Sequence, residues 1–321
     1  MKNLLGSIDI GGTKTMVGII DTAGNVRAKR HFPTFTPDCY ENFANCCTRF
    51  NECLAKLGVS FDNIEGIGIN MPGMVDAEGI LLQAPFAKWY NIDVKGYFAK
   101  AYNTDKIYAN NDVNSCAIGE MAFGGAGDNF LWVTVSTGIG GAFVVDGKVI
   151  YGSNACAGEL GHVKVEYEKP ALCGCGQHGC VEAHGSGTAI TRMFREKLQA
   201  NHELSAIIEA RGLPSDAKTC AILADQDNPE ALDVYRMAGI YVGRALSYAA
   251  NLVNPREVYI GGGVSDSLHL LLPSLLREFR EKTVTQCADI EIRKTALTYD
   301  AALIGAAAQV MVNNREGKNI N

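Results

Sequence analysis

The sequence lacks any apolar run long enough to act as an export signal or a membrane span. The N-terminus passes straight into a strand-like segment at residues 4–10, without the apolar core of a signal peptide. The longest apolar runs, such as residues 301–310, fall well short of the ~20 residues that a spanning helix needs. We therefore expect a soluble protein that is not exported.

A surplus of positive charge and a disulfide framework are also missing. Acidic residues outnumber basic ones by 35 to 29, and the net charge of −6 opposes non-specific attraction to nucleic acid or anionic lipid. Eleven cysteines is an odd number, and only one group of them is organised. This usage favours a reducing cytoplasm, and we expect neither nucleic acid nor a membrane as a partner.

No proline-rich or serine-rich linker divides the 321 residues, although this length predicts about two domains. Each is large enough to bury a core without disulfides or a metal. We expect a small first lobe over residues 1–112, joined by the C-terminal helix at about 298–321, and a larger lobe over residues 113–297. Without a tether near Asp112, we expect the two lobes to share a cleft.

A three-stranded meander is predicted twice, and helices alternate with strands after each copy. The strands of the two copies are expected at residues 4–10, 15–20 and 25–31 and at residues 130–135, 141–145 and 148–151. The other elements are expected as helices at 40–57 and 229–252 and strands at 66–70, 106–109 and 257–260. This alternation indicates the α/β class.

Glycine-rich turns follow three of the predicted strands, at residues 9–14, 136–141 and 261–265. Such turns let backbone N–H groups approach a phosphate without side-chain obstruction. One turn of this kind is equally typical of a plain hairpin, but three together indicate nucleotide binding. Their spacings match neither the Walker loop nor the dinucleotide fingerprint.

The duplicated meander with its glycine turns resembles the actin-like ATPase superfamily, whose members close two ribonuclease-H-like lobes around ATP. Three more segments resemble the ROK family of sugar kinases and repressors and occur in the family's order. They are Asn111-Asp112-Val113-Asn114, residues 157–162 (Ala-Gly-Glu-Leu-Gly-His) and residues 173–182 (Cys-Gly-Cys-Gly-Gln-His-Gly-Cys-Val-Glu). The resemblance runs from about Leu4 to Ala306, with Ser136 as a departure where many relatives have glycine. It implies an α/β fold of two ribonuclease-H-like lobes that flank a nucleotide and sugar cleft, with a zinc loop.

The resemblance implies ATP and Mg²⁺ at the glycine turns. Asp9 would orient Mg²⁺ through water, while Thr13, Lys14 and Thr137 would approach the phosphates. The predicted nucleotide-binding residues are Asp9, Gly11, Gly12, Thr13, Lys14, Thr137, Gly138, Gly140, Gly262 and Gly263.

A structural zinc ion is predicted at Cys173, Cys175 and Cys180, with His162 upstream as the fourth ligand. This Cys3His set suits tetrahedral zinc and leaves no open position for water. All four positions match the family's ligands. The alternatives are His178 as a competing ligand and a reduced cysteine-rich loop without an ion.

Carboxylates beside these ligands are candidates for sugar binding. Glu159 lies three residues before His162 and would share a helical face with it, and Glu182 follows Cys180 by two residues. By resemblance, Glu159, His162 and Glu182 bind the far hydroxyls of a hexose, although either glutamate alone is equally typical of a solvated charge. The predicted substrate-binding residues are Gly73, Asn111, Asp112, Glu159, His162 and Glu182. Because the glycine turns are remote from the cysteine loop in sequence, we expect zinc to support sugar binding more than ATP binding.

Asp112 is the candidate general base, because phosphoryl transfer to an alcohol needs a carboxylate that takes the hydroxyl proton. By resemblance it corresponds to the family's catalytic aspartate, with Asn111 holding neighbouring hydroxyls. Residues 110–112 are equally typical of a turn that caps the following helix. Trp89 and Tyr90 would flank the sugar or form a packed aromatic pair.

These features predict an ATP-dependent hexose kinase acting on the 6-hydroxyl of glucose or a related aldohexose. An N-acetylmannosamine (N-acylhexosamine) kinase or a fructokinase would use the same motifs. The intact Asp112 and glycine turns disfavour a sugar-sensing regulator, and we expect no winged-helix domain because the first turn begins at Asp9. A zinc-stabilised scaffold would show no ATP turnover. The resemblance also implies a homo-oligomer, either a dimer or a tetramer.

Overall fold

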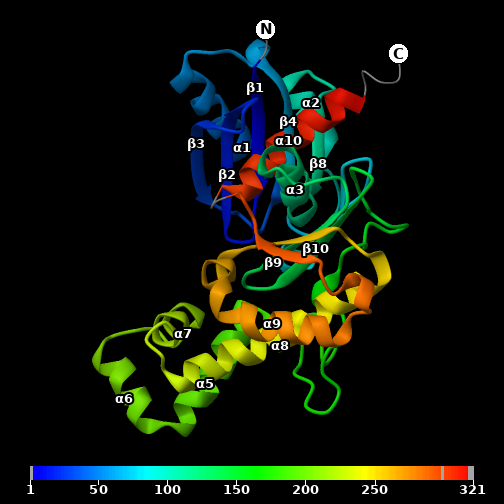
Figure 1. The fold of residues 1–321 in the computed structure, drawn as a ribbon. Helices are drawn as coiled ribbons and strands as arrows, with labels where there is room; N and C mark the ends of the chain where they lie inside the picture. The colour runs from blue at the N-terminus through cyan, green and yellow to red at the C-terminus, as the bar shows by residue number, and fades with distance from the viewer. Residues whose placement is uncertain (1–2, 298–299, 317–321) are drawn as a thin grey trace. The chain divides into compact units, whose positions relative to one another are not determined.

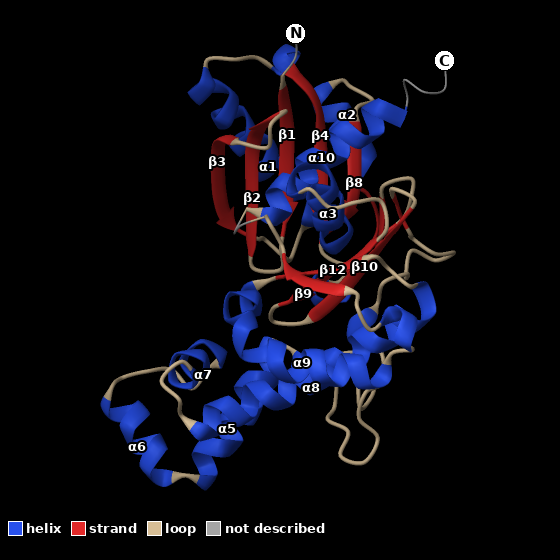
Figure 2. Cartoon of the chain, in the orientation of Figure 1, coloured by secondary structure: helices blue, strands red, loops and turns tan. Residues whose placement is uncertain are grey.

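The computed structural model describes residues 3–297 and 300–316, and they form two compact units of the expected α/β class. Of the described residues, the first unit comprises 3–128, 142–157, 295–297 and 300–316, and the second comprises 129–141 and 158–294. Figures 1 and 2 show their helices and strands. Parts of the predicted C-terminal stretch, residues 298–299 and 317–321, lie outside the described residues.

The first unit extends beyond the expected boundary at Asp112. Helix α3 (Asp112–Gly119) follows that boundary and packs against the C-terminal helix α10 (Ala301–Glu316). A Cβ atom placed on Gly119 would lie 2.9 Å from the Cα of Gly305, so the two helices are in close backbone contact. This packing holds α3 in the first unit.

A five-stranded sheet forms the centre of the first unit, in the order β3-β2-β1-β4-β8. The first meander is antiparallel as predicted, and β4 and β8 continue the sheet in parallel with β1. The strands are β1 (Leu4–Ile10), β2 (Lys14–Asp21), β3 (Val26–Pro33), β4 (Ile64–Met71) and β8 (Ile107–Asn111).

Helices cover both faces of this sheet, because its strands are apolar on both sides. Ile8 and Ile10 of β1 belong to the core that includes α1 (Cys39–Leu57). Leu5, on the alternate face, belongs to a second core with residues of α10, and the Ser7 hydroxyl donates to the Leu303 carbonyl. Figure 1 shows α10 running beside the sheet near α3.

A small three-stranded sheet in the first unit is not predicted from the sequence pattern. It has the order β5-β6-β7 and is followed by helix α2 (Val94–Tyr102). Its strands are β5 (Met74–Val75), β6 (Ile80–Ala84) and β7 (Trp89–Asp93). Trp89 is buried and its indole N–H donates to the Thr36 carbonyl, whereas Tyr90 is exposed, so the two aromatic rings do not share one environment.

The second meander belongs to a sheet of order β11-β10-β9-β12-β13. The third strand of this meander, β11, is shorter than expected, with two residues rather than four. The strands are β9 (Phe130–Val135), β10 (Ile139–Val145), β11 (Lys148–Val149), β12 (Glu257–Gly261) and β13 (Glu291–Lys294).

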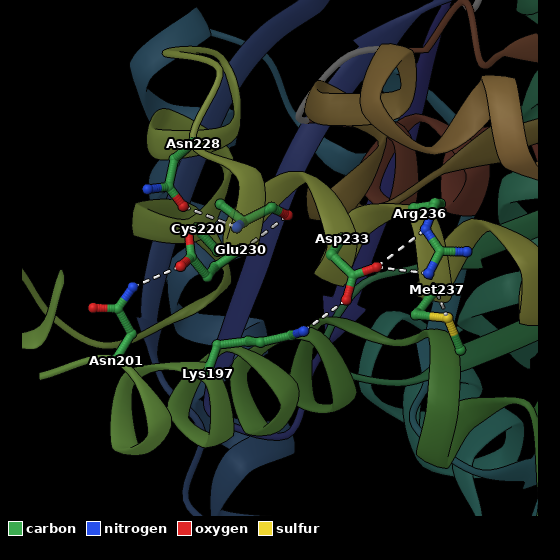
Figure 3. Close-up of polar contacts among 9 residues, drawn as sticks. Lys197, Asn201, Cys220, Asn228, Glu230, Asp233, Arg236 and Met237 are labelled. Carbon is green, nitrogen blue, oxygen red and sulfur yellow. Dashed lines mark hydrogen bonds and ion pairs between the residues drawn. The ribbon is translucent and has the colours of Figure 1, made fainter.

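Helices make up most of the second unit. They are α4 (Glu182–Gly185), α5 (Gly187–Ala200), α6 (His202–Ala210), α7 (Ala217–Ala224), α8 (Pro229–Val253) and α9 (Leu268–Lys282). Polar contacts hold α5 on α8: Lys197 Nζ lies 2.7 Å from Asp233 Oδ2, and Asn201 Nδ2 donates to Glu230 Oε1 over 2.6 Å (Figure 3). In the described part of the chain, no helix combines the length and apolarity needed to cross a membrane.

We expect Gly68→Ala to destabilise the protein strongly, because a Cβ at Gly68 of β4 would lie 1.7 Å from the Ala306 carbonyl oxygen of α10. Overpacking typically costs about 1–3 kcal/mol, and a clash with backbone belongs at the upper end of this range. The measurement is the urea unfolding midpoint. Gly127→Ala is the control, since its Cβ would meet nothing within 4 Å. Equal stability of the two variants would contradict the close packing of α10 on β4.

Candidate functional site

Two predicted carboxylates of the first unit, Asp9 and Asp112, influence each other electrostatically. Asp9 lies near the end of β1, is 8% exposed, and accepts a hydrogen bond from Asn70 Nδ2 over 3.3 Å. Burial raises the pKa of Asp9 to about 7, with a further contribution from the charge of Asp112, while Asn70 and Lys14 oppose the rise. The structure therefore brings Asp9, Lys14 and Asp112 into one neighbourhood, as a phosphate and metal site requires.

Asn111 connects two of the predicted sugar-binding positions. Its Oδ1 atom accepts hydrogen bonds from the N–H groups of Val113 and Asn114 and thereby caps α3. Its Nδ2 atom donates to the Gly73 carbonyl over 2.9 Å. The capping interpretation is thus correct, and the same side chain also holds Gly73 beside the start of α3. Within the described residues, the Asn111 amide group donates one of its two hydrogens to Gly73, which leaves the other for a hydroxyl oxygen.

The base of the first glycine turn is held by hydrogen bonds within the turn and from Thr34 outside it. The Gly11 N–H donates to the Lys14 carbonyl over 3.0 Å, and the Thr34 hydroxyl donates to the Gly11 carbonyl over 2.7 Å. Gly12 and Thr13, at the tip, are exposed. The turn therefore has a fixed base and an accessible tip, which suits the approach of a phosphate.

Asn70 and Gln309 are supporting residues that the sequence pattern does not identify. Asn70 Nδ2 donates to the Ala302 carbonyl over 2.7 Å as well as to Asp9, and Gln309 Nε2 donates to Asn70 Oδ1 over 3.2 Å. Both residues are buried. For Asn70, the signal in the sequence is a polar residue at the end of an apolar strand, which is too common to identify a site.

A cavity of about 1060 Å³ in the second unit brings two of the three predicted turns together. Thr137 of the second turn and Gly263 of the third turn both line it, and Thr188 near the start of α5 donates its hydroxyl to the Thr137 carbonyl over 2.8 Å. Apolar side chains such as Ile222 and Tyr235 come from α7 and α8. The volume and the mixed polar and apolar lining suit a nucleotide. The helical part of the lining was missed because no glycine motif marks it.

The other glycines predicted in the second and third turns have different surroundings. A Cβ on Gly138 would lie 2.4 Å from Glu182 Oε2, so Gly138 is in close contact with that carboxylate. Gly140 is the second residue of β10, and Gly262 precedes the cavity-lining Gly263. Their roles toward a nucleotide stay predictions.

The four predicted metal ligands meet within the second unit. The ligand atoms of His162, Cys173, Cys175 and Cys180 all lie within 4.8 Å of one another. The Cys175 and Cys180 sulfurs are 3.7 Å apart, and Cys173 Sγ is 3.7 Å from His162 Nδ1. Zn–S bonds of about 2.3 Å at tetrahedral angles put two sulfurs about 3.8 Å apart, so the spacing suits zinc.

The thiols of this cluster differ in pKa: a hydrogen bond from the Gln177 backbone lowers the pKa of Cys175. Burial raises the pKa of Cys173 to about 12, so at neutral pH a bound cation would be needed to hold its thiolate. His178, the competing candidate, is exposed on the cysteine loop and is outside this cluster.

The two glutamates lie beside the cluster in different ways. Glu159 precedes a short 3₁₀ helix (Leu160–His162) rather than sharing an α-helix with His162, and its Oε2 lies 3.7 Å from His162 Nε2. Glu182 Oε1 lies 3.5 Å from Cys173 Sγ, and its Oε2 accepts a hydrogen bond from the Ile139 N–H over 3.0 Å. The cysteine loop is therefore remote from the second glycine turn in sequence but in contact with it in space.

Comparison with known proteins identifies the family of this chain. The sequence profile of the ROK family matches residues 5–312. A glucokinase from Halalkalibacterium halodurans is 33% identical over 306 residues, 93% of this chain and 92% of the relative. The xylose repressor of Bacillus subtilis is 28% identical over 249 residues, 77% of this chain and 61% of the relative. A solved ROK family glucokinase from Streptomyces griseus, in complex with glucose and AMPPNP, has a TM-score of 0.80 and 29% identity, and the match covers 95% of this chain and 98% of that one. With the profile matched over nearly its whole length, this chain belongs to the ROK family.

Proposed function

We propose that this chain is an ATP-dependent hexose kinase that transfers the γ-phosphate to the 6-hydroxyl of glucose or a related aldohexose. The observation that carries the proposal is Asp112, the first residue of α3, whose charge raises the pKa of the buried Asp9. A carboxylate in this setting is suited to take a hydroxyl proton, with a second one close by for a metal. The relatives named glucokinase, one of them solved with glucose and AMPPNP, support the substrate pair.

Each unit supplies distinct groups in this proposal. In the first unit, Asp112 accepts the proton, Asn111 orients a hydroxyl, and the turn at residues 11–14 approaches the phosphates. In the second unit, the cavity lined by Thr137 and Gly263 holds the nucleotide, and Glu159 and Glu182 bind the far hydroxyls. Mg²⁺ bound with the nucleotide would neutralise phosphate charge, and the Asp9 carboxylate would orient it. Zinc at the Cys3His cluster would hold the cysteine loop rigid.

An ADP-release assay across a panel of sugars tests the activity directly. We expect turnover with glucose, and the panel includes mannose, fructose and N-acetylmannosamine so that a related kinase would be recognised by its preferred acceptor. Binding of sugar without ADP release on any member of the panel would overturn the kinase and support a sugar-sensing regulator, the role named for the repressor relatives.

We expect Asp112→Asn to lower kcat by about 10²- to 10⁴-fold and to leave glucose affinity within a few-fold, because a general base acts in the transition state. Steady-state kinetics and calorimetric titration with glucose measure the two effects. Asp105→Asn, at an exposed aspartate before β8, is the control and should behave as wild type. Near-normal turnover of the Asp112 variant would remove that residue from the role.

We expect Asp9→Asn to raise the Mg²⁺ requirement and also to stabilise the ligand-free protein at high pH. The pKa of Asp9 is about 7 in the folded chain, against about 4 for an ordinary Asp in the unfolded chain. Stability is therefore full below about pH 4 and falls as the pH rises through about 7, by roughly 3–4 kcal/mol at most. The Asp9→Asn variant has no ionisable group at this position, so it does not lose stability in this way.

The test is thermal unfolding of wild type and Asp9→Asn at about pH 5 and pH 8, with Asp105→Asn as control. The advantage of Asp9→Asn should grow toward the higher pH. A constant difference between the two proteins would show that Asp9 keeps an ordinary pKa.

We expect Cys180→Ser to lose zinc and to weaken glucose binding by about 10- to 100-fold, because the ion holds the loop that carries Glu182. Since Glu182 also contacts the second glycine turn, nucleotide affinity should fall as well, contrary to the expectation from sequence distance. Metal analysis and calorimetry with glucose and with ADP measure these effects. Cys156→Ser, at an exposed cysteine outside the cluster, is the control. Wild-type protein without stoichiometric zinc would contradict the metal assignment.

A further inference from the structure

The side chain of Glu182 contacts two parts of the second unit that are far apart in sequence. Its Oε2 atom accepts a hydrogen bond from the Ile139 N–H over 3.0 Å, and its Oε1 atom lies 3.5 Å from Cys173 Sγ. Glu182 begins α4, directly after the cysteine loop, and is half-buried. One carboxylate therefore joins the cysteine loop to the turn that precedes β10.

The turn at residues 136–139 fits closely around this carboxylate. A Cβ on Gly138 would lie 2.4 Å from Glu182 Oε2, so a side chain there would displace the carboxylate from its present position. Within the turn, the Ser136 N–H donates to the Gly138 carbonyl over 2.9 Å. The hydrogen bond from Ile139 to Glu182 thus fixes a turn whose internal geometry is already closed.

The start of α5 holds the other side of the same turn. The Gly187 N–H donates to the Ser136 carbonyl over 2.7 Å, and Thr188 Oγ1 donates to the Thr137 carbonyl over 2.8 Å. Helix α5 follows Glu182 by only five residues, so one short segment supplies both attachments. Thr137, Gly187 and Thr188 all line the cavity of about 1060 Å³.

We propose that Glu182 is a positioning residue for the nucleotide. It holds the turn at residues 136–139 in place, in addition to any contact with sugar. This inference rests on the proposed function, since it takes the cavity to be the nucleotide site. Ile139 is buried, so its N–H is costly to leave without an acceptor, and loss of the Glu182 oxygen releases the turn from its attachment on that side.

Substitutions at Glu182 separate the two roles. Glutamine keeps an oxygen that accepts from the Ile139 N–H, but it removes the charge that favours binding of sugar hydroxyls. Alanine removes both the accepting oxygen and the charge. Aspartate keeps the charge, but its shorter side chain places the oxygen one methylene farther from the Ile139 N–H. We expect ADP affinity to fall about 10- to 100-fold in Glu182→Ala and Glu182→Asp but within about three-fold of wild type in Glu182→Gln.

The experiment is calorimetric titration of the zinc-loaded proteins with ADP and Mg²⁺ in the absence of sugar, and separately with glucose. Zinc content is measured for each protein. Glu159→Ala is the matched control, because Glu159 is the other proposed sugar carboxylate and lies beside His162. It should lose glucose affinity and keep ADP affinity. Hydrogen exchange of the segment that contains the Ile139 amide should speed up in Glu182→Ala and Glu182→Asp but not in Glu182→Gln.

Two outcomes would overturn the inference. One is ADP affinity in Glu182→Ala or Glu182→Asp equal to that of zinc-loaded wild type, and the other is a loss in Glu182→Gln as large as in those variants. If Glu182→Ala fails to keep zinc, the comparison of Glu182→Asp with Glu182→Gln decides. Failure of wild type itself to bind ADP would instead sink the proposed kinase function, so the two failures are distinguishable.

Discussion

The contact between α10 and β4 is the constraint on which the site of the first unit depends. With no side chain at Gly68, the backbone of α10 lies directly on the strand, and the Ala302 carbonyl reaches the amide of Asn70. The same amide donates to Asp9. Because Asn70 and Ala302 are 232 positions apart, the C-terminal helix sets the position of a carboxylate near the N-terminus only through folding.

That arrangement keeps a carboxylate in a place where its charge is costly. Burial raises the pKa of Asp9, and Asp112 adds to the rise through repulsion of like charges. A protein tolerates two neighbouring carboxylates where a cation binds and offsets their repulsion. Lys14 already lowers the pKa of Asp9. Strong perturbation of a buried acid beside a glycine turn is typical of a functional site rather than of a structural core.

The second unit depends on a different kind of support. The exposed positions of its cysteine loop include Cys175 and His178, and the loop brings four candidate ligand atoms to one point, where a bound ion would hold it. The hydrogen bond from the Ile139 N–H to Glu182 connects this loop to the second glycine turn. Relatives named glucokinase and relatives named repressor both align with this chain, so likeness alone does not decide between them, and the case for a kinase rests on Asp112.

Local pattern by itself determined the two meanders, the glycine turns at strand ends and the four metal ligands. Strand alternation, turn residues and ligand spacing are short-range properties, and the Cys3His set is specific enough that the ligands converge as predicted. The resemblance of a few motifs added the family, which the comparison confirms. The small sheet β5-β6-β7 and the helical lining of the cavity left no comparable signal in the sequence.

Tertiary structure alone decided how separate segments meet. The placement of α3 with α10, the support of Asp9 by Asn70 and Gln309, and the contact of Glu182 with Ile139 join residues 43 or more positions apart. Such contacts depend on close backbone approach and on the direction of single hydrogen bonds, which no periodicity of the chain encodes. The cysteine loop and the second glycine turn are far apart in sequence, so the sequence indicated no contact between them. In the folded chain they are in contact, because Gly138 leaves room for the carboxylate of Glu182.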